Sequence, residues 1–462
     1  IGKCFDGIKS LDFGGEGSKN TATQDNRIFG MKSPEGEAVD FGPNLKARGN
    51  VENWLTATEA EMRVTLRDCL KAGVIDYTEK KRDVWLFDHC SQVILCCCGI
   101  FWAREVVSAF DSADVEAELK VCYERCADQL TDLTVLTRSE LTKLQRKVVS
   151  TVITLDVHAR DIIEDMISNQ TYKETDFGWQ MQLRFYWIDD ENNCRVKQTN
   201  AGFWYGYEYM GAQMRLVVTP MTDRCYMALS GALHLKLGGA PAGPAGTGKT
   251  ETTKDLAKGL AVQCIVFNCG DNLDYHFMAK FFCGLCQCGA WACFDEFNRI
   301  NIEVLSVVAQ QMISIQNALR SIPKDETQSR FNFDGKEIKI IETFGAFITM
   351  NPGYAGRTEL PDNLKVLFRP VAMMIPNYTM VAEVMLFSEG FQNAKPLSVK
   401  FIKLFKLSSE QLSQQKHYDF SMRAVKSVLV MAGDLLRANP DLKEDVTLIR
   451  AMRDSNIPKF LS

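Results

Sequence analysis

The fold class of this chain is decided by the stretch Gly243-Pro-Ala-Gly-Thr-Gly-Lys-Thr250. It matches in full the pattern G-x-x-x-x-G-K-[ST], in which a glycine-rich turn joins a strand to a helix. An apolar run precedes it, and a helix-forming segment, residues 251–260, follows it. Glycines let backbone N–H groups close around phosphate oxygens, and the helix N-terminus adds a positive dipole. Because a chance glycine-rich turn would lack these flanks, we expect a nucleotide-phosphate site.

The residues of this loop have distinct expected roles. Lys249 is expected to reach the β- and γ-phosphates of ATP, and the Thr250 hydroxyl is expected to bind Mg²⁺. The residues expected to contact the nucleotide here are Gly243, Pro244, Ala245, Gly246, Thr247, Gly248, Lys249, Thr250 and Glu251.

Length, composition and charge set broad limits. The chain has 462 residues, of which 46% are hydrophobic and 24% are charged, which suits two to four domains with sizeable cores. A net charge of -5 gives no basic field for nucleic acid. The longest apolar run, residues 93–102, is shorter than the roughly 20 residues of a membrane span, so we expect a buried helix and no membrane partner. The sequence begins at Ile1 without a signal-peptide pattern, which suggests a piece of a longer polypeptide.

The 16 cysteines lie mostly inside apolar runs, as in Cys96-Cys97-Cys98. Such neighbours do not form a secreted disulfide framework, so a reducing intracellular compartment is expected. The alternative is a zinc site made of Cys283, Cys286, Cys288 and Cys293. Their spacing is not that of paired C-x₂-C motifs and no histidine follows closely, so buried structural cysteines are favoured.

The predicted secondary structure changes along the chain. Residues 1–50 are rich in loops, amphipathic helices are expected at about 51–66, 84–110, 114–132 and 139–167, and short aromatic strands at about 183–187, 195–200 and 203–209. From residue 215, apolar strands alternate with helices, with an inserted hairpin around 323–335 and a last strand at 371–374. This alternation predicts a parallel sheet covered on both faces. Helices are then expected at about 381–390, 396–406, 408–415, 420–437 and 444–453.

An acidic pair, Asp295-Glu296, follows a buried strand. Open α/β sheets bind ligands at the carboxyl ends of their strands. Asp295 is expected to hold Mg²⁺ through its water shell, and Glu296 to orient and deprotonate the attacking water. Alone the pair would cap the next helix; after a phosphate loop, catalysis is the favoured interpretation.

Three further polar residues are candidates. Asn351, which ends the next strand in Thr349-Met-Asn, is expected to fix the lytic water or contact the γ-phosphate, although alone it would be a turn residue. Arg369 and Arg423 are candidate phosphate sensors, because a guanidinium group stays charged and binds phosphate bidentately; surface ion pairs are the alternative.

Together these stretches resemble the first AAA+ module of dynein heavy chains. The matching stretches are residues 243–250, 293–299, 348–357 and 359–369. Upstream, residues 141–148, 156–160 and 219–225 resemble the end of the dynein linker and the entry to the ring. The resemblance covers essentially the whole chain, and Phe331-Asn-Phe-Asp-Gly335 is most similar to axonemal, inner-arm, single-headed forms.

The resemblance implies a P-loop AAA+ fold preceded by an α-helical linker segment. The implied parts are a linker end at 1–205, a large α/β subdomain at 206–380 and a small helical subdomain at 381–462. The module would bind and hydrolyse ATP with Mg²⁺, and ATP-driven closure would move the linker. Asn351 would be the first sensor and Arg423 the second, while Val218 would lie in the adenine-side loop. Arg369 would be an arginine finger facing a neighbouring module, and Asn268 would restrain Glu296.

The resemblance also implies partners. These are the remaining AAA+ modules of the heavy chain, microtubules bound through a stalk outside these residues, and dynein intermediate and light chains. The implied location is the cytoplasm and cytoskeleton, in the axoneme of a cilium or flagellum. A non-motor AAA+ remodelling ATPase is the alternative, but it leaves the long helical segment unexplained. A module that binds ATP without hydrolysing it is disfavoured by the intact Glu296 and Asn351.

Overall fold

The computed structural model describes residues 4–14, 26–43, 45–270, 273–323, 326–351, 360–413, 415, 417–439 and 441–460. Residues 352–359, most of which belong to the stretches that resemble dynein, lie outside this set. The chain divides into two compact units, each built from separated stretches. Unit 1 comprises residues 1–104, 173–213 and 221–374, and unit 2 comprises residues 105–172, 214–220 and 375–462.

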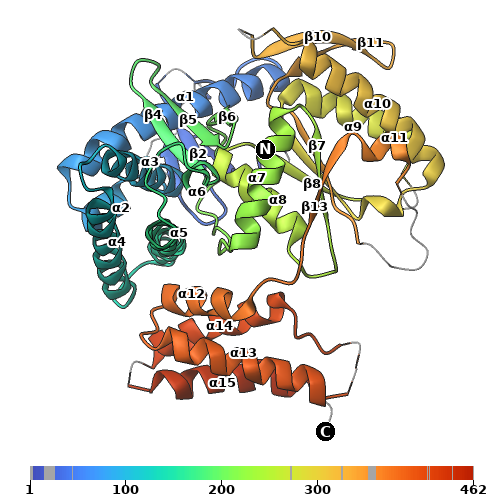
Figure 1. The fold of residues 1–462 in the computed structure, drawn as a ribbon. Coiled ribbons are helices and arrows are strands. Elements are labelled where there is room, and N and C mark those ends of the chain that lie inside the picture. The colour runs from blue at the N-terminus through green and yellow to red at the C-terminus, as the bar shows by residue number, and fades with distance from the viewer. Residues whose placement is uncertain are drawn as a thin grey trace. The chain divides into compact units, whose positions relative to one another are not determined.

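The centre of unit 1 is a five-stranded parallel sheet in the order β13-β7-β12-β9-β8 (Figure 1). Its strands in chain order are β7 (Gly238–Ala242), β8 (Cys264–Asn268), β9 (Trp291–Asp295), β12 (Gly345–Ile348) and β13 (Phe368–Ala372). Helix α7 (Pro220–His234) precedes β7, and the helices between the strands are α8 (Lys249–Leu260), α9 (Tyr275–Cys288), α10 (Ile302–Ser321) and α11 (Asp362–Lys365). This arrangement confirms the predicted parallel α/β sheet.

Both faces of the sheet are covered because successive side chains of a strand point in opposite directions. Ala292 and Phe294 of β9 pack into the core formed with α9 and α10, which lie side by side in Figure 1. Cys293 between them faces Thr253 of α8 instead. The apolar strand sequences follow from burial on both faces.

The predicted inserted hairpin is confirmed. Strands β10 (Gln328–Phe333) and β11 (Lys336–Ile341) pair antiparallel, and Asp334 and Gly335 form the turn with φ angles of 52° and 76°. Two residues with positive φ are typical of the tightest hairpin turns.

The remainder of unit 1 is helical with two small sheets. Its helices are α1 (Val51–Glu79), α2 (Arg82–Asp88), the first part of α3 (Ser91–Phe110) and α6 (Phe177–Gln180). Its three-stranded sheets are β1 (Ser10–Asp12), β2 (Gly30–Lys32) and β3 (Ala38–Asp40), and β4 (Arg184–Ile188), β5 (Asn193–Gln198) and β6 (Ala201–Trp204).

Helix α3 contains the longest apolar run. Within the described residues, it alone is long and apolar enough by length and composition to cross a membrane, and half of that window is buried. The Gln92 side chain bonds the backbone of Glu208 and Met210, and Cys96 Sγ lies 3.8 Å from Cys194 Sγ. These contacts are those of a core helix.

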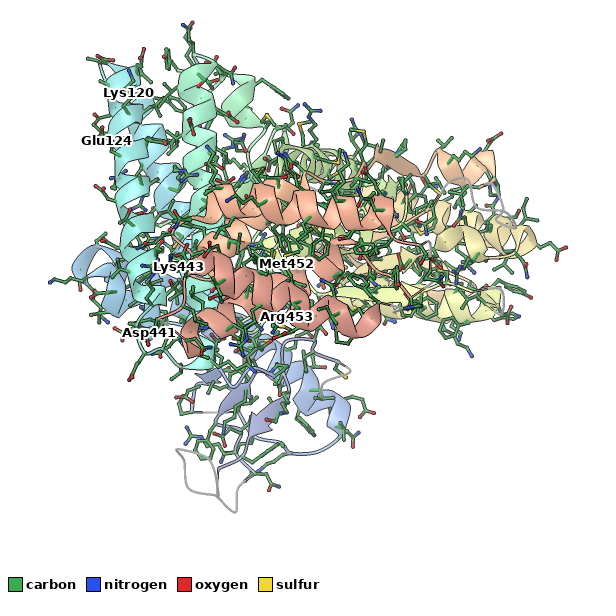
Figure 2. The ribbon with its side chains drawn as sticks, turned by 90° about the horizontal axis from the view of Figure 1, so that it is seen from below. Lys120, Glu124, Asp441, Lys443, Met452 and Arg453 are labelled. Carbon is green, nitrogen blue, oxygen red and sulfur yellow. The ribbon has the colours of Figure 1, made fainter. Side chains whose placement is uncertain are left out.

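Unit 2 contains the remaining helices, namely α4 (Val115–Thr137), α5 (Lys143–Ser168), α12 (Tyr378–Ser388), α13 (Ala394–Gln411), α14 (Met422–Ala438) and α15 (Glu444–Asn456). On α15, Met452 is buried in the core while its neighbour Arg453 faces solvent (Figure 2). On α4, Lys120 and Glu124 lie one turn apart on the exposed face (Figure 2). The helices are thus amphipathic, as their spacing predicts.

Several predicted boundaries are wrong. Residues 396–406 and 408–415 were expected as two helices, but α13 runs unbroken over Ala394–Gln411. The Ser408 hydroxyl bonds the Leu404 carbonyl of its own helix at 2.9 Å and does not cap a new helix. The predicted helix 84–110 is two helices, interrupted by an extended His89. The last strand is Phe368–Ala372 rather than 371–374.

Candidate functional site

The phosphate loop joins β7 to α8 at the carboxyl edge of the sheet. Gly246 and Gly248 have φ angles of 79° and 82°, a region that favours glycine. Gly243 meets a different constraint, because a Cβ there would lie 2.2 Å from the Met373 carbonyl oxygen. The pattern glycines are therefore required by the shape of the loop itself.

Lys249 points back into this loop. Its side chain is buried, and Nζ donates hydrogen bonds to the carbonyl oxygens of Gly243 at 2.9 Å and Pro244 at 2.7 Å. Thr247 Oγ1 also donates to the Pro244 oxygen at 2.9 Å. A buried ammonium group needs such acceptors, and phosphate oxygens would offer it stronger, charged ones.

Asp295 brings the loop and the neighbouring strand together. Thr250 Oγ1 donates to Asp295 Oδ1 at 2.7 Å, and the Thr349 hydroxyl donates to the same oxygen. Thr349 also accepts a hydrogen bond from the Glu296 N–H at 3.0 Å. A hydroxyl and a carboxylate therefore meet at the edge of the sheet where the phosphate loop ends.

Glu296 occupies a strained backbone position directly after β9, with φ 54° and ψ 43°. Its Oε1 accepts a hydrogen bond from Asn351 Nδ2 at 3.3 Å, and its Oε2 lies 2.5 Å from Arg299 Nε. Asn351 is buried, and its Oδ1 has no hydrogen-bond partner among the residues that the structure describes. An orphaned buried acceptor beside a carboxylate is typical of a site completed by a ligand or water.

The same carboxylates act on a nearby thiol. The pKa of the Cys269 thiol is raised to about 12, mainly by burial and also by the negative charges of Asp295 and Glu296. Cys269 therefore stays a neutral thiol beside the acidic pair at physiological pH.

Three other candidate residues have exposed side chains. Glu251 is exposed on the first turn of α8, with Lys254 Nζ 3.4 Å away. Asn268 ends β8 opposite Asp295 in the strand register, with an exposed side chain, and its restraint of Glu296 stays a prediction. Arg369 is exposed on β13.

Two candidates belong to unit 2. Val218 is buried in the segment 214–220, and its neighbour Val217 packs on the core of the helices. Arg423 is exposed in the first turn of α14. Their predicted roles toward a nucleotide stay predictions.

The cysteine-rich stretch offers no metal centre in the described part of the chain, where no group of three or more metal-ligating side chains is found. Cys286 and Cys293 are buried, and burial raises the pKa of both thiols. Cys286 lies in the apolar core formed with α9 and α10, whereas Cys293 faces Thr253 of α8.

Sequence reasoning assigned no role to Thr349 or Arg299. Thr349 was visible only as the residue two before Asn351, and Arg299 only as the end of a stretch that resembles dynein. The contact of Thr349 with Asp295 appears once β9 and β12 are paired, because the Thr349 N–H donates to the Phe294 carbonyl and the Phe297 N–H donates to the Thr349 carbonyl. Arg299 reaches Glu296 from three residues farther along the same turn.

Comparisons with known proteins agree with this geometry. Residues 205–462 match the family described as "Hydrolytic ATP binding site of dynein motor region", and residues 1–73 match "Dynein heavy chain, N-terminal region 2". The chain is 55% identical to human dynein axonemal heavy chain 6, covering 100% of this chain and 11% of that protein. It is 50% identical to mouse dynein axonemal heavy chain 1 (99% and 10%) and 51% identical to mouse dynein axonemal heavy chain 12 (100% and 14%). It thus spans between 10% and 14% of the length of these relatives.

Proposed function

Since this chain belongs to the dynein heavy chain family, we propose that it is the ATP-hydrolysing module of a microtubule motor of cilia or flagella, in which hydrolysis drives movement of a helical linker. The observation that carries the proposal is the meeting of Thr250 with Asp295 at the phosphate loop, with Glu296 and Asn351 beside them. These groups can hold Mg²⁺ and can position and deprotonate a water, which cleavage of a nucleoside triphosphate requires.

The donor set fits Mg²⁺. A hydroxyl and a carboxylate oxygen 2.7 Å apart are the hard ligands this ion takes, and Thr250 and Asp295 would hold it together with water. When bound, the ion supplies positive charge that neutralises the phosphate oxygens. Thr349 would keep the carboxylate of Asp295 oriented through its own hydroxyl.

The remaining groups of the site would bind ATP and activate the attacking water. Lys249 would exchange its loop carbonyl partners for phosphate oxygens, as their charge makes them better acceptors. Glu296 would take the proton of the attacking water, and the orphaned Oδ1 of Asn351 would accept a hydrogen bond from that water. Val218 on the adenine side, Arg423 as second sensor and Arg369 as a finger toward a neighbouring module complete the proposed assignments.

A short segment without regular secondary structure supplies a route from the site to the linker. We call residues 205–210 the strap. The Gly206 and Glu208 N–H groups donate to the carbonyls of Leu260 and Ala261, where helix α8 ends, at 2.9 and 3.0 Å. On its other side, Gln92 of α3 bonds the strap backbone at Glu208 and Met210. The helix that starts at the phosphate loop is therefore tied to a core helix of the proposed linker.

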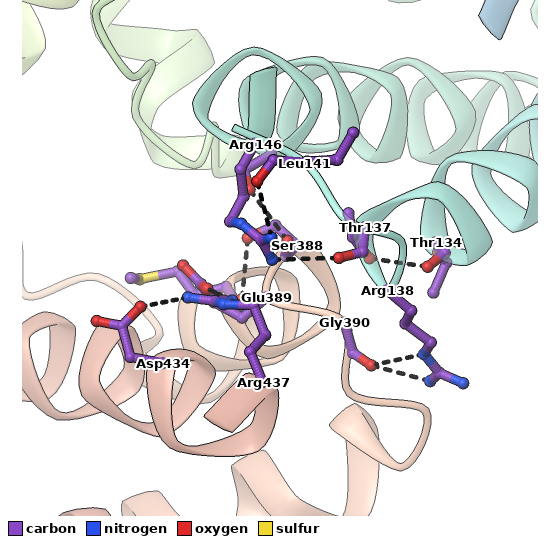
Figure 3. A network of polar contacts seen from close by, with 12 residues as sticks. Thr134, Thr137, Arg138, Leu141, Arg146, Ser388, Glu389, Gly390, Asp434 and Arg437 are labelled. Carbon is purple, nitrogen blue, oxygen red and sulfur yellow. Dashed lines mark hydrogen bonds and ion pairs between the residues drawn. The ribbon is translucent and has the colours of Figure 1, made fainter. Parts of the chain in front are cut away.

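A second connection lies inside unit 2. Arg138, at the end of α4, donates two hydrogen bonds to the Gly390 carbonyl at 3.2 and 2.9 Å, and Ser150 of α5 donates to the Ser388 carbonyl at 3.1 Å. Figure 3 shows this network, in which the Glu389–Arg437 ion pair also lies. Helices of the proposed linker end (1–205) are thus fastened to those of the proposed small subdomain (381–462), so the two would move together.

The proposed partners follow from the family. They are the other AAA+ modules of the same heavy chain, intermediate and light chains, and microtubules contacted by a stalk outside these residues. The proposed location is the axoneme.

The test is ATP turnover by the full-length heavy chain, with and without microtubules, beside its Lys249→Ala and Glu296→Gln variants. We expect microtubule-stimulated turnover that is lost in both variants, while Glu296→Gln still binds ATP. Turnover that ignores microtubules would favour a non-motor remodelling ATPase. Turnover that survives Lys249→Ala would place the main hydrolytic site in another module.

A further inference from the structure

Both oxygens of the Glu296 carboxylate have protein partners. Arg299 Nε lies 2.5 Å from Oε2, and Asn351 Nδ2 lies 3.3 Å from Oε1. A general base must present an oxygen to the water whose proton it takes, within about 2.6–3.2 Å. An oxygen that is paired with a guanidinium group cannot serve that water equally well. The pose of Glu296 in this structure is therefore a resting pose.

Backbone hydrogen bonds around Glu296 limit how its carboxylate can move away from Arg299. The Glu296 N–H donates to Thr349 Oγ1 at 3.0 Å, and the N–H of Phe297 donates to the Thr349 carbonyl at 3.0 Å. The Arg299 N–H in turn donates to the Glu296 carbonyl at 3.0 Å. With the main chain held on both sides, the carboxylate can leave Arg299 only by rotation of the side chains.

The ion pair between Arg299 and Glu296 is weak enough to be broken during the catalytic cycle. The side chain of Arg299 is 49% exposed and that of Glu296 is 28% exposed. Ion pairs at such exposure change an equilibrium by less than about fivefold. The pair can thus bias Glu296 toward the resting pose without preventing its release.

We propose that Arg299 is a positioning residue that withholds Glu296 from the attacking water until the nucleotide-bound site closes. The inference rests on the proposed role of Glu296 as the base. Arg299 acts through Glu296 and needs no contact with ATP. It is the nearest cation to that carboxylate among the described ion pairs.

The test uses the full-length heavy chain with Arg299→Gln and Arg299→Lys, and Arg320→Gln as a control, since Arg320 is exposed at the end of α10. Rapid-quench single-turnover experiments would measure the rate of ATP cleavage, beside the affinity for a fluorescent ATP analogue and the thermal unfolding midpoint. We expect Arg299→Gln to cleave ATP about two- to fivefold faster, with affinity and unfolding midpoint unchanged. Arg299→Lys should show a smaller rise, because it keeps the charge but loses the planar fork.

Other outcomes would overturn the inference. If Arg299→Gln cleaves ATP at the rate of the Arg320→Gln control, the ion pair has no part in the chemistry. If cleavage slows, Arg299 holds the productive pose instead. Glu296→Gln, measured in parallel, separates this from the wider proposal: cleavage that persists there refutes Glu296 as the base, whereas cleavage that is lost there while Arg299→Gln is neutral refutes only the role of Arg299.

Discussion

Glu208→Gln should stabilise the folded chain at neutral and alkaline pH. Glu208 lies in the strap, is 7% exposed, and has its nearest cation, Arg63 Nη2, at 3.8 Å. Burial raises the pKa of Glu208 from 4.5 to about 7; Arg63 opposes this rise and Glu59 adds to it. The carboxylate therefore bears a charge at pH 8 that its surroundings do not fully compensate.

The size of the effect follows from linkage. Because the pKa is higher in the folded than in the unfolded state, the folded state binds the proton more tightly, and stability falls as pH rises from 4.5 through about 7. Each pH unit between the two values is worth about 1.4 kcal/mol. The charge thus costs about 2 kcal/mol at pH 6 and about 3 kcal/mol at pH 8. Glutamine cannot ionise, so it should remove this cost.

Guanidinium unfolding of the 462-residue chain, followed by tryptophan fluorescence at pH 5, 6, 7 and 8, would test this. The gap in unfolding free energy between Glu208→Gln and the natural chain should widen up to about pH 7 and then stay constant. Glu124→Gln, on the exposed face of α4, is the control and should follow the natural chain. Parallel curves for Glu208→Gln and the natural chain, or a less stable Glu208→Gln at pH 8, would refute the reasoning.

Three further predictions concern other contacts. Thr349→Val leaves Asp295 with one donor fewer, so ATP cleavage by the full-length chain should fall about tenfold or more, as the loss of a buried hydrogen bond implies; Thr349→Ser should restore it in the same rapid-quench assay. Gly243→Ala brings a Cβ within 2.2 Å of a backbone oxygen and should cost about 1–3 kcal/mol of stability in chemical denaturation, with weaker ATP binding. Arg437→Met strands the buried carboxylate of Glu389, so unfolding at pH 8 should lose about 2–4 kcal/mol. Since burial raises the pKa of Glu389, that loss should shrink toward pH 5, whereas an equal loss at both pH values would contradict it.

The parallel sheet could be predicted from the sequence because its signals are local. Each strand is a short apolar run, and the phosphate loop marks where the first one ends. Helix ends were less predictable. Ser408 can cap a helix or bond back to its own helix, and the choice in α13 depends on packing that the sequence does not display.

The site likewise contains residues that could be predicted from the sequence and residues that could not. Lys249, Thr250 and the acidic pair are recognisable because their spacing along the chain carries the chemistry. The role of the Thr349 hydroxyl could not be recognised, because its partner Asp295 is on another strand and only the strand order β12-β9 brings the two residues together. A polar residue that serves a distant carboxylate leaves no periodic signal.

The hydrogen bonds between the strap and the end of α8 could not be predicted from the sequence, although their physical reason is simple. The aromatic run at 203–209 predicted a strand, but β6 ends at Trp204 and the chain beyond pairs with the end of a helix instead. The last carbonyls of any helix lack partners within it, so the N–H groups of a neighbouring segment can satisfy them. Gly206 permits the approach, because a Cβ there would lie 2.4 Å from the Ala261 oxygen. Helix α8 begins at the phosphate loop and ends on the strap, so a shift of α8 along its axis would displace the loop and the strap together. The strap therefore connects the nucleotide site mechanically to the proposed linker.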